Sequence, residues 1–256
     1  MKLTFPYVVN HLTVEQGKRT VIRNGKNVTI NKRTQIPMDW EYITIHNTGN
    51  TNSTARNERG WLQNSNNRSE TGFHIAIDEK EAIECLPLNE VAWHAGDGRG
   101  NGNMKSIGIE ICESGNYNKT MTNTIQLVAN LLYDNKKDTK ILRQHNDWSG
   151  KNCPRLIRSG HLGWTWQKFI IDVNKELKRI SIMNEVITLA SKYFKDVSDT
   201  QWKIDMADLG YERGIISGKS EGVFDPDSPI TRIEATTVVN RAIDYIFKEL
   251  RNKKVI

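Results

Sequence analysis

Residue types that bind metal ions stand in two places of the chain. His145 and Cys153 lie eight positions apart in one polar segment, and His46 lies 99 positions before His145. Two imidazoles and one thiolate are the ligands of a catalytic zinc ion whose fourth position is left for water. Glu110 and Lys151 would supply what that water needs to attack an amide. These residue types therefore predict a zinc-dependent hydrolase.

Each of these residues also has a simpler interpretation. An isolated histidine is usually a hydrogen-bonded structural residue, and Lys151 is compatible with a solvated loop. Glu110 lies between two isoleucines, where an acidic side chain is costly to bury unless it is paired or used. On an edge strand the same side chain would point outward into solvent.

The composition limits the class of protein. A chain of 256 residues with 37% apolar and 26% charged residues predicts a globular protein with one substantial core and a small module. No stretch approaches the roughly 18 apolar residues of a membrane span. The polar and charged residues that follow Tyr7 leave no room for the apolar region of a secretory signal peptide. We therefore expect no export by the signal-peptide route.

The three cysteines are an odd number, which argues against a disulfide framework. Cys85 and Cys112 lie in apolar, strand-like runs and are predicted to be buried thiols. Cys153 differs, because polar loop residues flank it and Pro154 follows it. A reduced compartment suits a zinc thiolate at that position.

Basic residues are concentrated in the first three quarters of the chain. Residues 193–256 hold 10 basic and 11 acidic residues, which leaves 26 of the 36 basic and 19 of the 30 acidic residues for residues 1–192. This basic body suggests an anionic partner, nucleic acid or a bacterial wall rich in polyanions, although solubility alone is an equal explanation. No run of basic residues with interleaved aromatics marks a nucleic-acid face, so we expect no nucleic-acid partner.

Hydrophobic periodicity predicts the elements that must position the candidate residues. Short apolar or alternating runs predict strands, and apolar spacings of three and four predict helices. The strands are expected at 42–49, 72–78, 82–88 and 106–113, and the helices at about 122–135 and 164–180. The predicted fold class of residues 1–180 is therefore α/β, a central mixed β-sheet flanked by helices.

The remaining residues predict a separate, small, all-α module. Residues 181–193 are interpreted as a helical linker, 194–246 as a helix–loop–helix, and 247–256 as a basic tail. Thr231 and Glu234 form a capping box at the start of the second helix. About fifty residues are few for independent stability, so the module is expected to need a partner surface or copies of itself.

Several short motifs of the chain resemble those of a known family. Residues 40–180 are similar to the zinc-dependent N-acetylmuramoyl-L-alanine amidases of the type-2 amidase and peptidoglycan-recognition fold, most of all to endolysins of phages that infect Bacillus and its relatives. The matching pieces are residues 43–48, 72–74, 91–96, 106–112 and 145–154. Residues 194–243 resemble one S-layer homology module, from Phe-Lys-Asp-Val at 194–197 to Ile-Thr-Arg-Ile-Glu at 230–234.

The resemblance implies a role for each candidate residue. His46, His145 and Cys153 match the family's zinc ligands, Glu110 its general base, and Lys151 the cation that steadies the oxyanion. It also implies hydrolysis of the amide between the lactyl group of N-acetylmuramic acid and the first L-alanine of the stem peptide.

Two further histidines match positions near the family's substrate groove. For His74 and His94, contact with the substrate and a structural role are equally good interpretations.

The module resemblance implies attachment to a wall polymer. S-layer homology modules bind pyruvylated secondary wall polysaccharides, and Arg232, at the start of a helix, suits an anionic ligand. Lys219 is a second candidate from the preceding loop, and a solvated capping-region residue is the simpler interpretation of Arg232. Such modules commonly occur in three copies, so a single copy leads to the hypothesis of a homo-oligomer.

Three alternatives stay open at this stage. A recognition protein of the same fold binds peptidoglycan without cutting it, but such relatives usually lack the metal-binding cysteine. A host autolysin would need a signal peptide, whereas an endolysin waits in the cytoplasm until lysis. A structural zinc site would need a fourth protein ligand, and none is evident near the motif.

Overall fold

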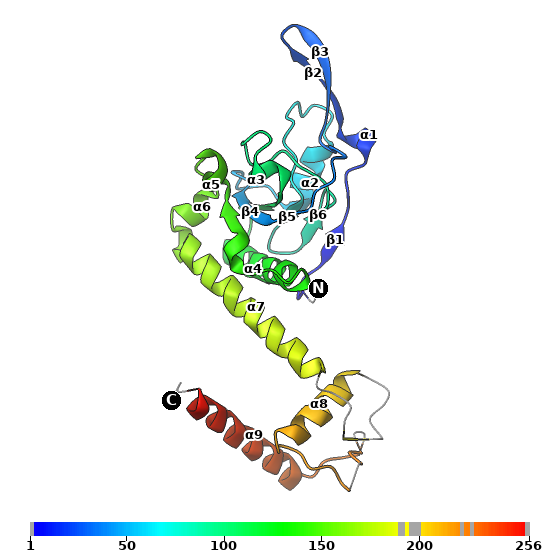
Figure 1. Ribbon diagram of the computed structural model, residues 1–256, viewed down its shortest axis with the longest axis vertical. Coiled ribbons are helices and arrows are strands. Elements are labelled where there is room, and N and C mark those ends of the chain that lie inside the picture. Colours follow the sequence, from blue (N-terminus) through cyan, green and yellow to red (C-terminus); the bar gives the residue numbers. More distant parts are fainter. Residues whose placement is uncertain (1–2, 189–192, 195–200, 221–222, 226–227, 254–256) are drawn as a thin grey trace. The chain divides into compact units, whose positions relative to one another are not determined.

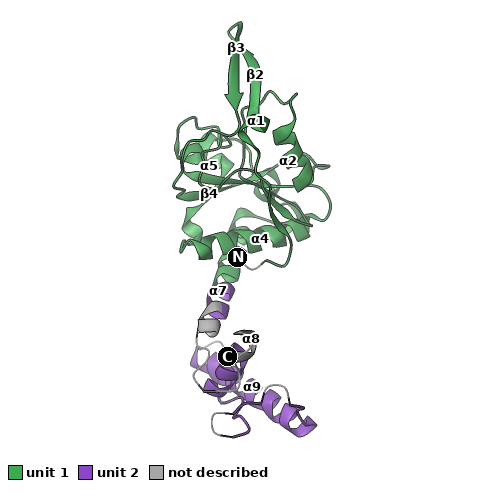
Figure 2. Cartoon of the chain, turned by 90° about the vertical axis from the view of Figure 1, so that its right-hand side faces the viewer, with its two compact units in different colours: residues 1–178 green, residues 179–256 purple. Residues whose placement is uncertain are grey.

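The computed structural model describes residues 3–188, 193–194, 201–220, 223–225 and 228–253. Its contacts divide the chain into two units, residues 1–178 and 179–256, coloured separately in Figure 2. Each unit is described by itself below.

A six-stranded sheet forms the centre of the first unit (Figure 1). Its order is β1-β6-β5-β7-β4-β8, where only the β5–β6 pair is antiparallel, so the sheet is mixed. The strands are β1 (Tyr7–Val9), β4 (Tyr42–Asn47), β5 (Ile75–Ile77), β6 (Ala82–Glu84), β7 (Ser106–Ile111) and β8 (Leu142–Gln144). The predicted fold class is confirmed, and each of the four predicted strands contains a shorter observed one.

Side chains of the neighbouring strands β4 and β7 alternate between an apolar and a polar face. Five isoleucines of β4 and β7 are fully buried: Ile43, Ile45, Ile107, Ile109 and Ile111. The side chains between them are polar or absent, and they include Thr44, His46, Gly108 and Glu110. Because successive side chains of a strand point to opposite faces, the sheet separates its core face from the face that carries chemistry.

Helices cover both faces of this sheet. Figures 1 and 2 show α4 (Tyr117–Asp134) on one face and α2 (Ala55–Gln63) on the other. Helix α4 begins five residues before the predicted start, because the Asn116 side chain accepts a hydrogen bond from the backbone N–H of Lys119 and caps it there. Helix α7 (Trp166–Thr188) runs beyond the predicted end at 180 into the expected linker.

Short helices complete the first unit between and after the strands. They are α1 (Val14–Gly17), α3 (Asn101–Met104), α5 (His145–Ser149) and α6 (Arg155–Arg158). Cys85 and Cys112 are fully buried free thiols, as predicted.

The sequence analysis did not predict a β-hairpin made of β2 (Lys18–Arg23) and β3 (Lys26–Asn31). Its two-residue turn is Asn24-Gly25, and both residues have positive φ, of 49° and 74°. An Asn-Gly pair between alternating residues is a strong hairpin signal, because both positions tolerate the left-handed conformation that such a turn requires. The turn residues therefore predict this hairpin, whereas hydrophobic alternation alone does not.

The second unit contains α8 (Gln201–Glu212) and α9 (Arg232–Asn252). The predicted capping box is confirmed: the Thr231 hydroxyl accepts from the Glu234 backbone N–H, and the Glu234 carboxylate accepts from that of Thr231. Phe194 and Ala207 form the small buried cluster, with Ile216 and Phe224 packed against it. No helix in the described part of the chain is long and apolar enough to cross a membrane.

Candidate active site

Two neighbouring strands bring His46 and Glu110 together. Strands β4 and β7 are parallel, and His46 is directly opposite Glu110 in the register. Facing residues of neighbouring strands point to the same side of the sheet, so the imidazole and the carboxylate share the polar face. Nδ1 of His46 lies 3.9 Å from a carboxylate oxygen of Glu110.

The segment after β8 supplies the other two candidate ligands. His145 opens α5 directly beyond β8, which pairs with β4, and the chain then returns to Cys153. The backbone N–H of Asn146 donates to the carbonyl of Cys153 at 2.9 Å and closes this loop. Nδ1 of His46 lies 3.0 Å from Nδ1 of His145 and 3.8 Å from Sγ of Cys153.

This donor set fits a zinc ion. One ligand atom from each of His46, His145 and Cys153 lies within 4.8 Å of the others, and all three residues are buried. A tetrahedral zinc ion with bonds of about 2.0–2.3 Å holds its donors roughly 3.3–3.7 Å apart. The two separations from Nδ1 of His46, 3.0 Å and 3.8 Å, lie near this range. Oε2 of Glu110 is buried without a hydrogen-bond partner among the described residues, which also suits a further group at this place.

Burial sets the protonation of the cluster. It lowers the pKa of His145 to about 4 and that of His46 well below its ordinary value, so both rings are neutral and can act as ligands. Burial raises the pKa of Glu110 to about 8 and that of the Cys153 thiol to about 11. A carboxyl group whose pKa lies near neutrality can both accept and return a proton.

The cluster lies at the base of a cleft of about 730 Å³. Lys151 lines this cleft with its exposed side chain, so the structure brings all five predicted catalytic and metal-binding residues to one place. The sequence analysis missed three aromatic residues that also line it, Trp61, Phe73 and Trp93. Their spacing carried no signal, because strand and loop contacts bring them together.

The other two candidate histidines, His74 and His94, differ in their surroundings. His74 has no exposed surface: its Nδ1 accepts from the Gly108 N–H at 2.9 Å, and its Nε2 bonds the Glu90 carbonyl at 2.8 Å. These two bonds and its complete burial favour the structural interpretation of His74 over contact with a substrate. His94 lines the cleft and bonds His46.

The candidate wall-binding residues lie in the second unit. Lys219 lines a hollow of about 530 Å³ with Arg241 and apolar residues, and its ammonium group is 2.9 Å from the Asp225 carboxylate. Arg232 is exposed at the start of α9 and is not among the residues that line this hollow. The two predicted residues therefore do not share one pocket.

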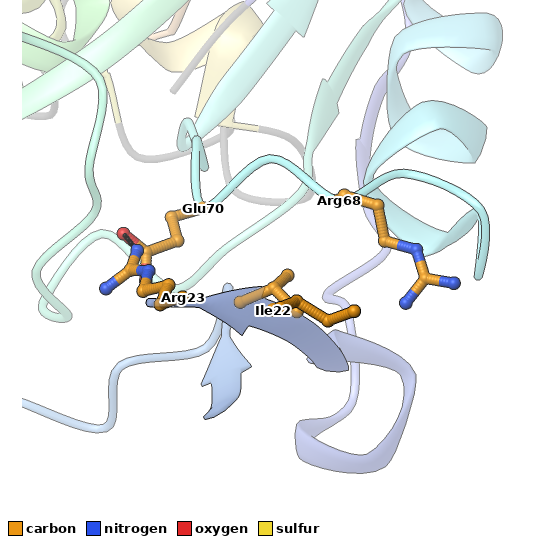
Figure 3. Close-up of a pocket in the computed structure, with 5 residues that line it drawn as sticks. Ile22, Arg23, Arg68 and Glu70 are labelled. Carbon is orange, nitrogen blue, oxygen red and sulfur yellow. Dashed lines mark ion pairs between the residues drawn. The ribbon is translucent and has the colours of Figure 1, made fainter. Parts of the chain in front are cut away.

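A further hollow, of about 560 Å³, lies beside the β2–β3 hairpin (Figure 3). Arg23 pairs with Glu70 at 2.5 Å, and the Arg68 guanidinium donates to the carbonyl of Thr20. These contacts join the hairpin to the segment 68–70. Because both guanidinium groups already have partners, the hollow is not an evident anion site.

Fold and site together define a protein of the α/β class with a cluster of metal-ligating groups beside strands β4 and β7 of its sheet. Residues 36–156 match the family model of N-acetylmuramoyl-L-alanine amidase, and residues 193–236 match that of the S-layer homology domain. The chain belongs to the N-acetylmuramoyl-L-alanine amidase family and carries a C-terminal S-layer homology domain.

Individual relatives agree with this assignment. The amidase CwlA of Bacillus subtilis is 36% identical over 217 residues, which are 82% of this chain and 73% of CwlA. The amidase XlyA of Bacillus subtilis is 35% identical over 244 residues, covering 89% of this chain and 82% of XlyA. The solved structure of a mutant endolysin from Bacillus subtilis aligns with a TM-score of 0.56 at 33% identity, over 66% of this chain and 99% of that one.

Proposed function

We propose that the protein is a zinc-dependent peptidoglycan hydrolase. Its substrate is the amide between the lactyl group of N-acetylmuramic acid and the L-alanine of the stem peptide. The observation that carries the proposal is the meeting of His46, His145 and Cys153 with the buried carboxyl group of Glu110 in one cleft. These three residues would hold the zinc ion.

When bound there, a zinc ion supplies Lewis acidity toward the scissile carbonyl and makes water more acidic. Glu110 accepts the proton of the attacking water, for which its raised pKa and its place beside His46 suit it. Lys151, exposed in the cleft, donates to the oxyanion that forms. Glu110 then returns the proton to the amine of the leaving alanine, which completes hydrolysis.

The second unit would attach the enzyme to its substrate. We assign residues 1–180 to the catalytic domain, 181–193 to a linker, 194–246 to the wall-binding module and 247–256 to a basic tail, of which residues 247–252 continue helix α9. Arg232 and Lys219 are the proposed contacts to a pyruvylated secondary wall polysaccharide, because each offers a cation to an anionic polymer. The exposed apolar residues of α9 support assembly of this module with further copies of the chain.

The proposed site of action is the bacterial cell wall. By the endolysin interpretation, the enzyme accumulates in the cytoplasm of the producing cell and reaches peptidoglycan at lysis. Similarity to a Bacillus endolysin supports this interpretation over that of a host autolysin.

Mass spectrometry of digested peptidoglycan tests the bond that is cut. We expect free stem peptides that begin with L-alanine and no new reducing sugar ends. New reducing ends, or cleaved peptide cross-links, would refute the proposal, and so would binding of peptidoglycan without any product. Elemental analysis of the purified chain tests the cofactor, with one zinc expected per chain and far less in Cys153→Ser.

A further inference from the structure

His94 connects the metal-ligating cluster to the backbone of β7. Its Nε2 lies 3.0 Å from the carbonyl oxygen of Ser106, and its Nδ1 lies 3.0 Å from Nε2 of His46. All three residues are buried. This pair of bonds constrains the position of the proton on each ring.

The direction of the two bonds follows from the carbonyl group. A carbonyl oxygen only accepts, so Nε2 of His94 must carry a proton and donate it. His94 is buried, and its ring nitrogens face a carbonyl and an imidazole and no carboxylate, so a second proton would be an unpaired buried charge. Its Nδ1 therefore has a lone pair and accepts from His46. His46 then carries its proton on Nε2, and its Nδ1 lone pair faces His145 and Cys153.

The backbone around His94 is itself fixed. Oδ1 of the buried Asn103 accepts from the N–H groups of both His94 and Ala95, each at 2.8 Å. Its Nδ2 donates to the carbonyl of Gly98 at 2.9 Å. The ring of His94 packs directly on β7 at Gly108, where a Cβ atom would lie 2.7 Å from Cγ of His94. Ring and backbone are therefore both held in place.

The same segment also adjoins the second imidazole. A Cβ atom on Gly96 would lie 3.5 Å from Nε2 of His145, on the side of that ring away from His46. His145 also forms a hydrogen bond with the backbone of Ala95. Residues 94–96 therefore lie beside Nε2 of both His46 and His145, the ring nitrogens that point away from Cys153.

We propose that His94 is a positioning residue that fixes the Nε2-protonated tautomer of His46, so that Nδ1 is presented to the metal. Asn103 and Gly108 hold His94 in the place where it can do this. Partners of this kind around a metal site raise its affinity by about 10–100-fold, because the ligands need no reorientation when the ion binds. The inference rests on the proposed metal centre, but the tautomer itself is a property of the chain.

The first test needs no variant. Long-range ¹H–¹⁵N correlation spectra of the ¹⁵N-histidine-labelled full chain, without metal, report which nitrogen of each of the six histidines carries the proton. We expect protonated Nε2 on both His46 and His94. A proton on Nδ1 of His46 would overturn the proposal, even if every variant failed to fold.

The second test compares zinc affinity between variants by competition with a chelator. His94→Phe removes the acceptor and should weaken zinc binding by about 10–100-fold. His94→Asn keeps an acceptor oxygen near the Nδ1 position and should recover most of that loss. The matched control is His74→Phe, which removes a buried imidazole whose nitrogens bond Gly108 and Glu90 and keeps an aromatic ring against that of His94. It should stay within about threefold of the parent.

Two outcomes separate this inference from the proposed function. A folded His94→Phe variant with parental zinc affinity would refute the role of His94 and leave the amidase assignment untouched. A parent chain that binds zinc and shows the expected tautomer, but releases no L-alanine-terminated peptides, would refute the proposed function alone.

Discussion

The two units differ in how they bury apolar side chains. In the first, the isoleucines of β4 and β7 are completely enclosed, and the opposite face of the same strands carries the active-site groups. In the second, no described residue of α9 is buried, although it has a row of apolar side chains: Ile233, Val239, Ile243, Ile246 and Phe247. The first unit completes its own core, whereas the second leaves these apolar side chains exposed.

This difference matters because catalysis and attachment need different supports. A site that must hold donor atoms within tenths of an ångström requires strands and packed neighbours that do not move. An attachment module needs only a surface that is complementary to its ligand or to another copy. The comparison predicts that chemistry is sensitive to changes in the first unit and insensitive to changes in the second.

The largest expected effect is a loss of turnover on replacing Glu110, which replacing Glu234 should not cause. Glu110→Gln should lower turnover of a soluble muramoyl peptide by about 10²–10⁴-fold, because the amide cannot accept the proton of water. Zinc content should remain at the parental value. Glu234→Gln, at the start of α9, is the control and should leave turnover unchanged; a comparable loss there would break the proposed separation of roles.

The next largest effect concerns the free energy of unfolding. It compares the removal of a buried apolar group with the removal of an exposed one. Ile109→Ala should lower the free energy of unfolding by about 2–5 kcal/mol, because it leaves a cavity in a core residue with no exposed surface. Ile243→Ala, at 45% exposed, should change it by less than about 0.5 kcal/mol in dilute solution. Urea denaturation monitors both. An effect at Ile243 that grows with protein concentration would show that copies of the chain cover α9.

A smaller effect is expected for attachment. Arg232→Ala should weaken retention on purified wall fragments roughly tenfold, because it removes one charged hydrogen-bond donor from an anionic polymer. Turnover of a soluble fragment should be unaffected. Co-sedimentation with walls measures retention, and unchanged sedimentation would remove Arg232 from the proposed contact.

The smallest effect concerns the helix caps of the two units. Thr54 caps α2 and Thr231 caps α9, each with its hydroxyl accepting from the backbone N–H three residues on. Replacing either by alanine should lower the stability of its own unit by about 1 kcal/mol. Thermal unfolding followed by circular dichroism tests this, and equal shifts of both transitions would mean that the units unfold together.

Much of the fold could be predicted from the sequence, and the failures have local causes. Hydrophobic periodicity located four strands and two helices, because alternation and 3.6-residue spacing are imposed by burial against the sheet. The hairpin was missed although Asn24-Gly25 marked its turn. The start of α4 was placed too late, although Asn116 caps the first turn and the buried Tyr117 and Met121 precede Ile125 at spacings of four.

The candidate site could also be predicted only in part. The residue types at 46, 110, 145, 151 and 153 were enough to suggest zinc chemistry, because few side chains bind that ion or activate water. The sequence does not distinguish His74 from His94, because both lie among apolar neighbours in the chain. The partners of each ring separate them: Gly108 and Glu90 for His74, and His46 and Ser106 for His94.

The sequence alone determined the donor set, the alternation of the strands and the two-part organisation, because these depend on residue type and short-range spacing. The tertiary structure decided which imidazole nitrogen faces the cluster, which aromatic side chains line the cleft, and that α9 has no buried side chain. Those properties depend on strand register and on contacts between residues far apart in the chain, which local spacing does not encode.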